Sequence, residues 1–137
     1  MKTEQVKHGG LLWAVIVRCG NVSPGVHFVT PQENALQVGK QWRPKGTVIN
    51  SHVHCAIALK NHDSFLQEVL HIERGKLKVI FYTDDGKCID ERLLGAGDTI
   101  LLIQGGHGFE ILEETQMLEV KMGPYDPVSK KNIQEKT

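Results

Sequence analysis

The sequence predicts an all-β protein, built from short strands that form a sandwich or a barrel. Short apolar or alternating runs recur along the 137 residues, with Gly, Pro, Asn and Asp between them. Almost no stretch has the apolar spacing of an amphipathic helix. The length is typical of one domain and allows a buried core that needs no disulfide.

The first expected strand, Leu11–Val17, is apolar throughout and far shorter than the ~20 residues of a membrane-spanning helix. We therefore expect it to be a buried strand. In chain order the expected strands are Leu11–Val17, His27–Thr30, Leu36–Val38, Thr47–His54, Glu68–Ile72, Leu77–Tyr82, Thr99–Ile103, Gly108–Leu112 and Met117–Lys121.

Two turn signals separate the later strands. Asp84-Asp85-Gly86 follows an apolar run, and Asp-Gly favours a hairpin because both residues tolerate positive φ. Gly95-Ala96-Gly97-Asp98 predicts a second tight turn, which leads into Ile100–Ile103. That apolar run is typical of a strand covered on both faces. The segment 56–67 fits a strand edge, a loop or one helical turn, and the polar, lysine-rich segment 129–137 is expected to be frayed.

The charge of the chain is balanced, with 16 basic and 16 acidic residues. This balance argues against nucleic acid or an anionic membrane as a partner, and favours a small molecule or a second copy of the chain. The three cysteines have no C-x-x-C spacing, and Met1–Gly10 lacks the apolar core of a signal peptide. We therefore expect a cytoplasmic protein.

Four residues have the pattern of a metal site. His52 and His54 are two apart on an expected strand, so their imidazoles point to the same side. Glu68 lies on a later strand and adds a carboxylate, and His107 follows the turn Gly105-Gly106. Three imidazoles and one carboxylate suit one divalent transition metal such as Zn, Ni, Mn or Fe, rather than Ca or Mg. A six-coordinate ion bound in this way keeps two positions open for water or substrate.

Other chemistry-bearing residues have simpler interpretations. Cys55 has the parity opposite to its neighbouring histidines, so we expect it to pack rather than bind metal. The run 105–108 is rich in glycine but lacks the lysine and hydroxyl residues of a phosphate-binding loop, and no Gly-x-Ser-x-Gly elbow occurs. Four histidines are expected on the surface or hydrogen-bonded in the core: His8, His27, His62 and His71.

The metal-site residues stand in a recognisable motif. Gly46 is followed by five residues and by His52-Val53-His54, and Glu68 is followed by six residues and Gly75. This pattern resembles the first motif of the cupin superfamily, although the thirteen residues between His54 and Glu68 exceed the usual gap. A looser second motif runs from Gly97-Asp98 to His107, with Ile103 in place of the usual proline and no asparagine after the histidine.

The resemblance covers most of the chain, from Gly46 to Val120. It implies a double-stranded β-helix, the jelly-roll barrel of cupins, whose interior is lined by His52, His54, Glu68 and His107 as metal ligands. It also implies N-terminal strands (1–45) that pack on or extend the barrel, a barrel core (46–122) and a C-terminal tail (123–137). Three segments resemble small bacterial cupins associated with cell-surface polysaccharide biosynthesis: Gln67–Leu70, Leu102–Glu110 and Glu119–Tyr125.

Glu119 and Lys121 share one parity on the last expected barrel strand. They are candidate catalytic acid–base groups if they face the interior, and an ion pair on the outer surface is the alternative. The favoured function is a metal-dependent isomerase or epimerase acting on a small polar, sugar-derived substrate. An iron-dependent dioxygenase and a non-catalytic sugar-binding module are the other two hypotheses. We also expect a homodimer, with Leu11–Val17 as the strand that pairs.

Overall fold

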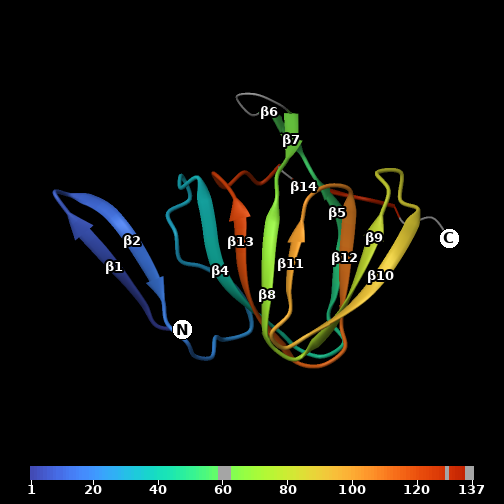
Figure 1. The fold of residues 1–137 in the computed structure, drawn as a ribbon, viewed down its shortest axis with the longest axis horizontal. Helices are drawn as coiled ribbons and strands as arrows, with labels where there is room; N and C mark the ends of the chain where they lie inside the picture. Colours follow the sequence, from blue (N-terminus) through green and yellow to red (C-terminus); the bar gives the residue numbers. More distant parts are fainter. Residues whose placement is uncertain (59–62, 129, 135–137) are drawn as a thin grey trace.

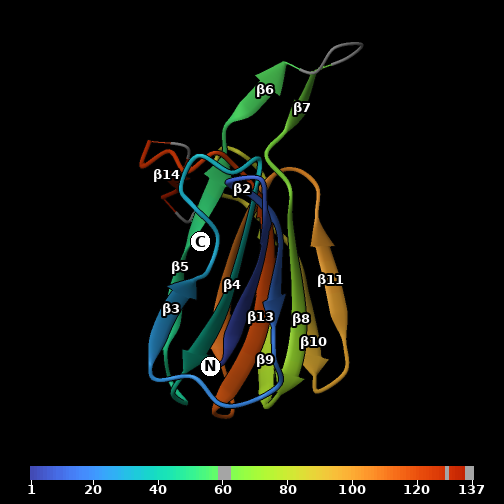
Figure 2. The same cartoon turned by 90° about the vertical axis from the view of Figure 1, so that its left-hand side faces the viewer.

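The structure, a computed structural model, describes residues 1–58, 63–128 and 130–134. It confirms the all-β prediction, because the residues it describes form strands and no helix. Two five-stranded sheets lie face to face and form a double-stranded β-helix (Figures 1 and 2). Accordingly, no helix in the described part of the chain is long and apolar enough to cross a membrane.

The two sheets are built from strands that lie far apart in the sequence. The first sheet has the order β11 (Thr99–Leu102), β8 (Glu68–Arg74), β13 (Thr115–Met122), β4 (Leu36–Arg43) and β3 (Gly25–Phe28). The second has the order β10 (Cys88–Gly95), β9 (Lys76–Tyr82), β12 (Gly106–Ile111), β5 (Val48–His54) and β14 (Lys130–Asn132). The chain crosses from one sheet to the other several times, so both sheets contribute side chains to one interior.

The hydrophobic core lies between the sheets, because alternate residues of each strand face inward. In β8, for example, Leu70 and Ile72 are buried while His71 between them is only partly buried. The core residues come from β8, β9, β11, β12 and β13 and are Leu70, Ile72, Leu77, Val79, Leu102, Phe109, Ile111 and Met117.

The inward-facing residues change from apolar to polar toward one end of the barrel. Taken in that direction they are Ile72, Leu70 and Glu68 in β8, Ile111, Phe109 and His107 in β12, and Met117, Glu119 and Lys121 in β13. The apolar end closes the core, and the polar end gathers ionisable groups that are costly to bury without partners. The polar end is therefore where a functional site belongs.

Most of the expected strands form, but two expectations about burial were wrong. Leu11–Val17 is strand β2, and its Leu11 and Trp13 are 67% and 68% exposed. Strand β11 lies at the edge of its sheet, so Leu101 is half exposed and only one face of the strand is covered. In both cases an apolar run reflects strand propensity and does not by itself show how many faces are covered.

Several strands were not expected from the sequence. They are β1 (Thr3–His8), β10, β14 and the paired strands β6 (Ala56–Ala58) and β7 (Asp63–Phe65). The last two decide among the alternatives for segment 56–67, because they form a hairpin that projects beyond the end of the sheets (Figures 1 and 2). Lys130–Asn132, expected to be frayed, pairs with β5 instead.

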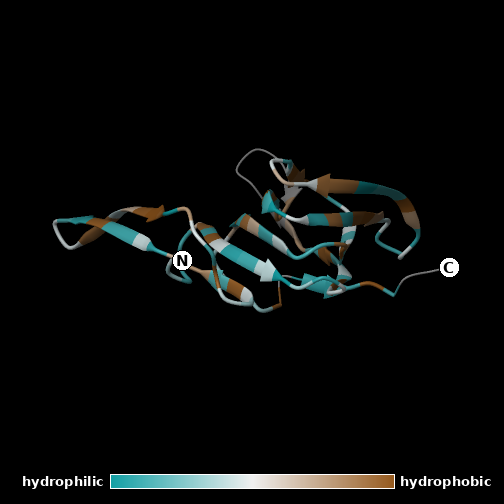
Figure 3. Cartoon of the chain, turned by 90° about the horizontal axis from the view of Figure 1, so that it is seen from below, coloured by the Kyte–Doolittle hydropathy of each residue, from teal (hydrophilic) through white to brown (hydrophobic). Residues whose placement is uncertain are grey.

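Strands β1 and β2 form a separate two-stranded hairpin that stands apart from both sheets (Figures 1 and 3). Its exposed apolar side chains include Val6, Leu11 and Trp13. A two-stranded hairpin with uncovered apolar side chains is only marginally stable in water, so it gains stability from a further surface that covers it. The homodimer stays a prediction, and we expect this hairpin to supply its contact with a second copy.

A Leu11→Ser/Trp13→Ser variant is therefore expected to have half the molar mass of the wild type at the same concentration. The two substitutions replace large exposed apolar side chains and leave the barrel core untouched, so the fold is retained. Light scattering coupled to size-exclusion chromatography measures the mass, and circular dichroism checks the strand content. A wild type that is already monomeric, or a variant that remains dimeric, would contradict the prediction.

Candidate metal centre

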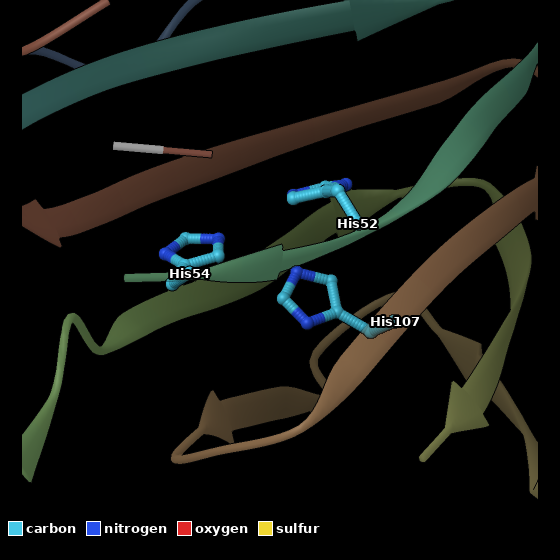
Figure 4. A group of neighbouring side chains, drawn as sticks. All are labelled: His52, His54 and His107. Carbon is cyan, nitrogen blue, oxygen red and sulfur yellow. The ribbon is translucent and has the colours of Figure 1, made fainter. Parts of the chain in front are cut away.

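Three histidines converge at the polar end of the barrel. His52 and His54 lie on one face of β5, and His107 on β12 stands directly opposite His52 in the antiparallel register. The candidate ligand nitrogens of all three lie within 4.8 Å of one another. Their ring centroids are 4.6 to 5.3 Å apart, and the rings point into one common space (Figure 4). This spacing allows one ion to contact all three side chains.

The facing nitrogens of the cluster have no hydrogen-bond partner. The Nε2 atoms of His52, His54 and His107 are buried and form no hydrogen bond with the described part of the chain, although Oε2 of Glu68 stands 3.4 Å from Nε2 of His54. Nδ1 of His52 lies 2.9 Å from the carbonyl oxygen of Asn50, to which it donates, so Nε2 carries the free lone pair. Three unpartnered buried nitrogens are costly, and a bound cation removes that cost.

The surroundings keep these histidines neutral. Burial lowers the pKa of His52, and it lowers the pKa of His54 to about 4 and that of His107 to about 3. A neutral imidazole offers a lone pair, whereas a protonated one cannot bind a metal. The cluster is thus ready to bind a metal ion at neutral pH without first releasing protons.

Glu68 reaches the cluster from the opposite sheet. Its Oε2 lies 3.4 Å from Nε2 of His54, and both side chains are almost fully buried. Burial, and then the nearby carboxylate of Glu119, raise the pKa of Glu68 above its usual range. A cation next to these oxygens would favour the charged form, as it does for carboxylates that bind metals. The structure therefore gathers three of the four expected ligands, the histidines, into one cluster, and it places the fourth, Glu68, against His54.

Glu119 and Lys121 face the interior of the barrel beside Glu68. Glu119 is 2% exposed and accepts a hydrogen bond from the side-chain amide of Gln41. Its Oε1 lies 3.6 Å from Nζ of Lys121, whose ammonium also stands 4.4 Å from the ring centre of Phe28. The ion pair considered for the outer surface is thus formed inside, next to the histidine cluster.

Two cavities open beside these residues. One has a volume of about 210 Å³ and lies between the sheets, where His52, Glu68 and Glu119 contribute to its wall. The other, about 240 Å³, lies nearer the end of the barrel and contacts His54 and Tyr125. Each is large enough for a small polar molecule, and each reaches at least one histidine of the cluster.

Sequence reasoning missed two residues of this region. Gln41 lies on β4, where its parity relative to its neighbours could have placed it inward, but the expected strand ended at Val38. Lys130 was not found because the polar tail carries no strand pattern. Its strand β14 is held by backbone pairing with β5, in which Lys130 stands opposite His54.

The remaining histidines and Cys55 lie outside the cluster. The ring of His8 packs against Trp13, His27 contacts the carbonyl oxygen of Ser23, and Nδ1 of His71 contacts the hydroxyl of Thr99. His62 is outside the described residues. Cys55 is exposed rather than buried as expected, and its Sγ lies 3.6 Å from the carbonyl oxygen of Val128.

The donor set defines which ions fit. Three neutral imidazoles with one carboxylate form a site of intermediate hardness, which suits Zn, Ni, Mn or Fe. Calcium and magnesium prefer a shell made only of oxygen. The unpartnered nitrogens and the buried carboxylate thus fit a divalent transition metal, and His52, His54, His107 and Glu68 are the residues that would hold it.

Comparison with known proteins identifies the fold. No protein-family model matches the sequence, and no curated protein matches it. Among solved structures, an uncharacterized conserved protein with a double-stranded β-helix domain from Klebsiella pneumoniae has a TM-score of 0.59 and 19% identity, over 87% of this chain and 91% of that one. A cupin-2 domain protein from Shewanella frigidimarina has a TM-score of 0.53 and 15% identity, over 76% and 85%.

Oxalate decarboxylase from Bacillus subtilis has a TM-score of 0.56 and 20% identity, over 72% of this chain. The chain spans only 24% of that protein. At these identities the similarity shows a shared fold, the double-stranded β-helix of cupins, which is the fold that the sequence motif implied.

Proposed function

We propose that this chain is a metal-dependent enzyme of the isomerase or epimerase type, acting on a small polar, sugar-derived substrate. The observation that carries the proposal is the set of three buried histidine nitrogens without partners, next to Glu68 and to the interior pair Glu119 and Lys121. An isomerase or epimerase of this kind requires metal-binding side chains and acid–base side chains in the same cavity. The fold neighbour named oxalate decarboxylase, an enzyme named for a small polar molecule, supports a substrate of this size.

A divalent ion held by the histidines and Glu68 would supply Lewis-acid polarisation of a substrate carbonyl. The rest of the chemistry falls to the chain's own side chains. Glu119 is the candidate base, because its carboxylate is buried in the cavity wall and is oriented by Gln41 and Lys121. In the proposed reaction it takes a proton from the carbon next to the substrate carbonyl.

Lys121 completes the acid–base arrangement. Its ammonium stands beside Glu119, and it can stabilise negative charge that develops on the substrate. Protonation of the other face of the carbon by the ammonium of Lys121 gives an epimer. Return of the proton from Glu119 to the former carbonyl carbon, while the proton of the adjacent hydroxyl moves to the former carbonyl oxygen, gives an isomer. No oxidant or further co-reactant is needed, since one proton leaves the substrate and one is added. The proton held by Glu119 exchanges with water before the second transfer, so the proton that is added comes from the solvent.

The test uses the metal-loaded protein in D₂O with a panel of small hydroxy and keto sugar acids, followed by NMR. We expect deuterium at the carbon next to the carbonyl together with an isomeric product. Glu119→Gln and Lys121→Met should lower the rate about 10²- to 10⁴-fold while metal content stays unchanged. Lys131→Met is the control, because Lys131 lies on the face of β14 opposite to that of Lys130. This variant should turn over the substrate at the wild-type rate. Turnover that survives complete metal removal would contradict the proposal.

The same four ligands are also compatible with an iron-dependent dioxygenase, or with a binding module that has no turnover. Oxygen uptake that requires both Fe(II) and a substrate from the panel would favour the dioxygenase. Tight binding of a panel compound with no product by mass spectrometry, whichever metal is loaded, would favour the binding module. Together, the NMR, oxygen-uptake and binding measurements separate the three functions.

A further inference from the structure

We propose that Lys130 and Lys121 form a subsite for an anionic group of the substrate, a carboxylate or a phosphate, beside the histidine cluster. The inference deepens the proposed function and rests on it, because the anion would be part of the molecule that occupies the same cavities. It is carried by the placement of the two lysines and by the charge balance around them.

The strand β14 brings Lys130 to the site from the C-terminal segment. In the antiparallel pairing of β14 with β5, Lys130 is opposite His54 and Asn132 is opposite His52. Residues directly opposite each other in such a pair extend to the same face of the sheet. Lys130 therefore shares the inner face with the two histidines, while Lys131, opposite Val53, belongs to the other face.

The two lysines lie where the two cavities meet. Lys121 and Lys130 are the residues that contribute to the walls of both the 210 Å³ and the 240 Å³ cavity. Both lysines thus border a small molecule in either cavity, together with His52 in the inner cavity or His54 in the outer one. Each ammonium has three N–H donors, so the contact of Lys121 with Glu119 leaves donors for a ligand.

The balance of charge favours an anion. On the wall of the inner cavity the cations of Lys121, Lys130 and Arg43 outnumber the carboxylates of Glu68 and Glu119, and a divalent ion would add to that excess. Lys121 is largely buried and Lys130 is exposed. Positive charge that is not fully neutralised attracts a negative group.

The experiment is calorimetric titration of the purified protein, its metal content measured in parallel, with malonate, inorganic phosphate and uncharged glycerol. We expect one or both anions to bind and glycerol not to bind. Lys130→Met and Lys121→Met should each weaken anion binding about 10- to 100-fold, the usual range for loss of a charge-assisted contact. Lys130→Arg should retain most of the affinity, and Lys131→Met should match the wild type within about twofold.

The outcomes separate this subsite from the reaction proposed above. Stronger binding of malonate would identify a carboxylate group in the substrate, and stronger binding of phosphate would identify a phosphate ester. Anion binding that is unchanged in Lys130→Met, or glycerol binding as strong as that of the anions, would overturn the subsite. Anion binding that needs Lys130 but is accompanied by no turnover would leave the subsite standing and overturn only the isomerase.

Discussion

A His52→Ala/His54→Ala variant is expected to lose its metal, whereas the wild type purified without a tag or chelators carries close to one equivalent per chain. Both histidines direct a buried, unpartnered Nε2 into the shared space of the cluster. Substituting residues that only hydrogen-bond to the metal ligands lowers metal affinity about 10- to 100-fold. Removing two direct ligands should therefore cost well over 100-fold, enough to empty the site during purification.

The measurement is elemental analysis of the folded proteins by inductively coupled plasma mass spectrometry. His71→Ala is the matched control, since His71 lies on the same strand as Glu68 but contacts Thr99 on the other face of the sheet. It should keep its full metal content. If the wild type is empty and cannot be reloaded, or if the double variant retains its metal, the metal centre is excluded. Iron in the wild type would favour the dioxygenase, and zinc, nickel or manganese would favour Lewis-acid chemistry.

The parity of side chains along strands made most of the site predictable. A two-residue period brings His52 and His54 to one face, and the same rule places Glu119 and Lys121 together on β13. What parity leaves open is which face is the inner one. The structure answers this through Met117, a core residue that shares the parity of Glu119 and Lys121.

Other features depend on pairing across the sheets, which a single strand does not reveal. Strand β10 was not expected because the run between Ile89 and Leu93 is polar. Both of these apolar residues are exposed, so the strand is positioned by its backbone hydrogen bonds to β9. Lys130 enters the site for a similar reason, because β14 pairs with β5 and forms the edge of that sheet. Local sequence carries little information about such pairing.

The long gap between His54 and Glu68 also has a structural explanation. The strands β6 and β7 within it form a hairpin that extends from the end of the barrel where the histidines lie (Figures 1 and 2). The extra residues therefore leave the register of β5 and β8 intact. This is why Glu68 still reaches His54 despite the departure from the usual spacing.

A Gly75→Ala variant is expected to lose more than about 3 kcal/mol of unfolding free energy, a large share of the 5–15 kcal/mol typical of a domain. Gly75 joins β8 to β9 with a φ of +90°, which L-residues rarely adopt. A Cβ there would lie 2.2 Å from the carbonyl oxygen of Glu114 and 2.7 Å from Cα of Thr115. Both are backbone atoms, so they cannot move aside as a flexible side chain would.

Gly97→Ala is the matched control, because Gly97 has a φ of +92° but open space around its Cα. Its cost should be the backbone strain alone, about 1–2 kcal/mol. Urea unfolding of both variants, with metal removed so that ligand binding does not contribute, gives the two free energies. Equal losses would contradict the prediction. A clearly larger loss of unfolding free energy in Gly75→Ala would show that Gly75, at the end of the histidine–glutamate motif, is required for the close approach of two turns. Its role in the motif would then be structural, since it takes no part in binding the metal.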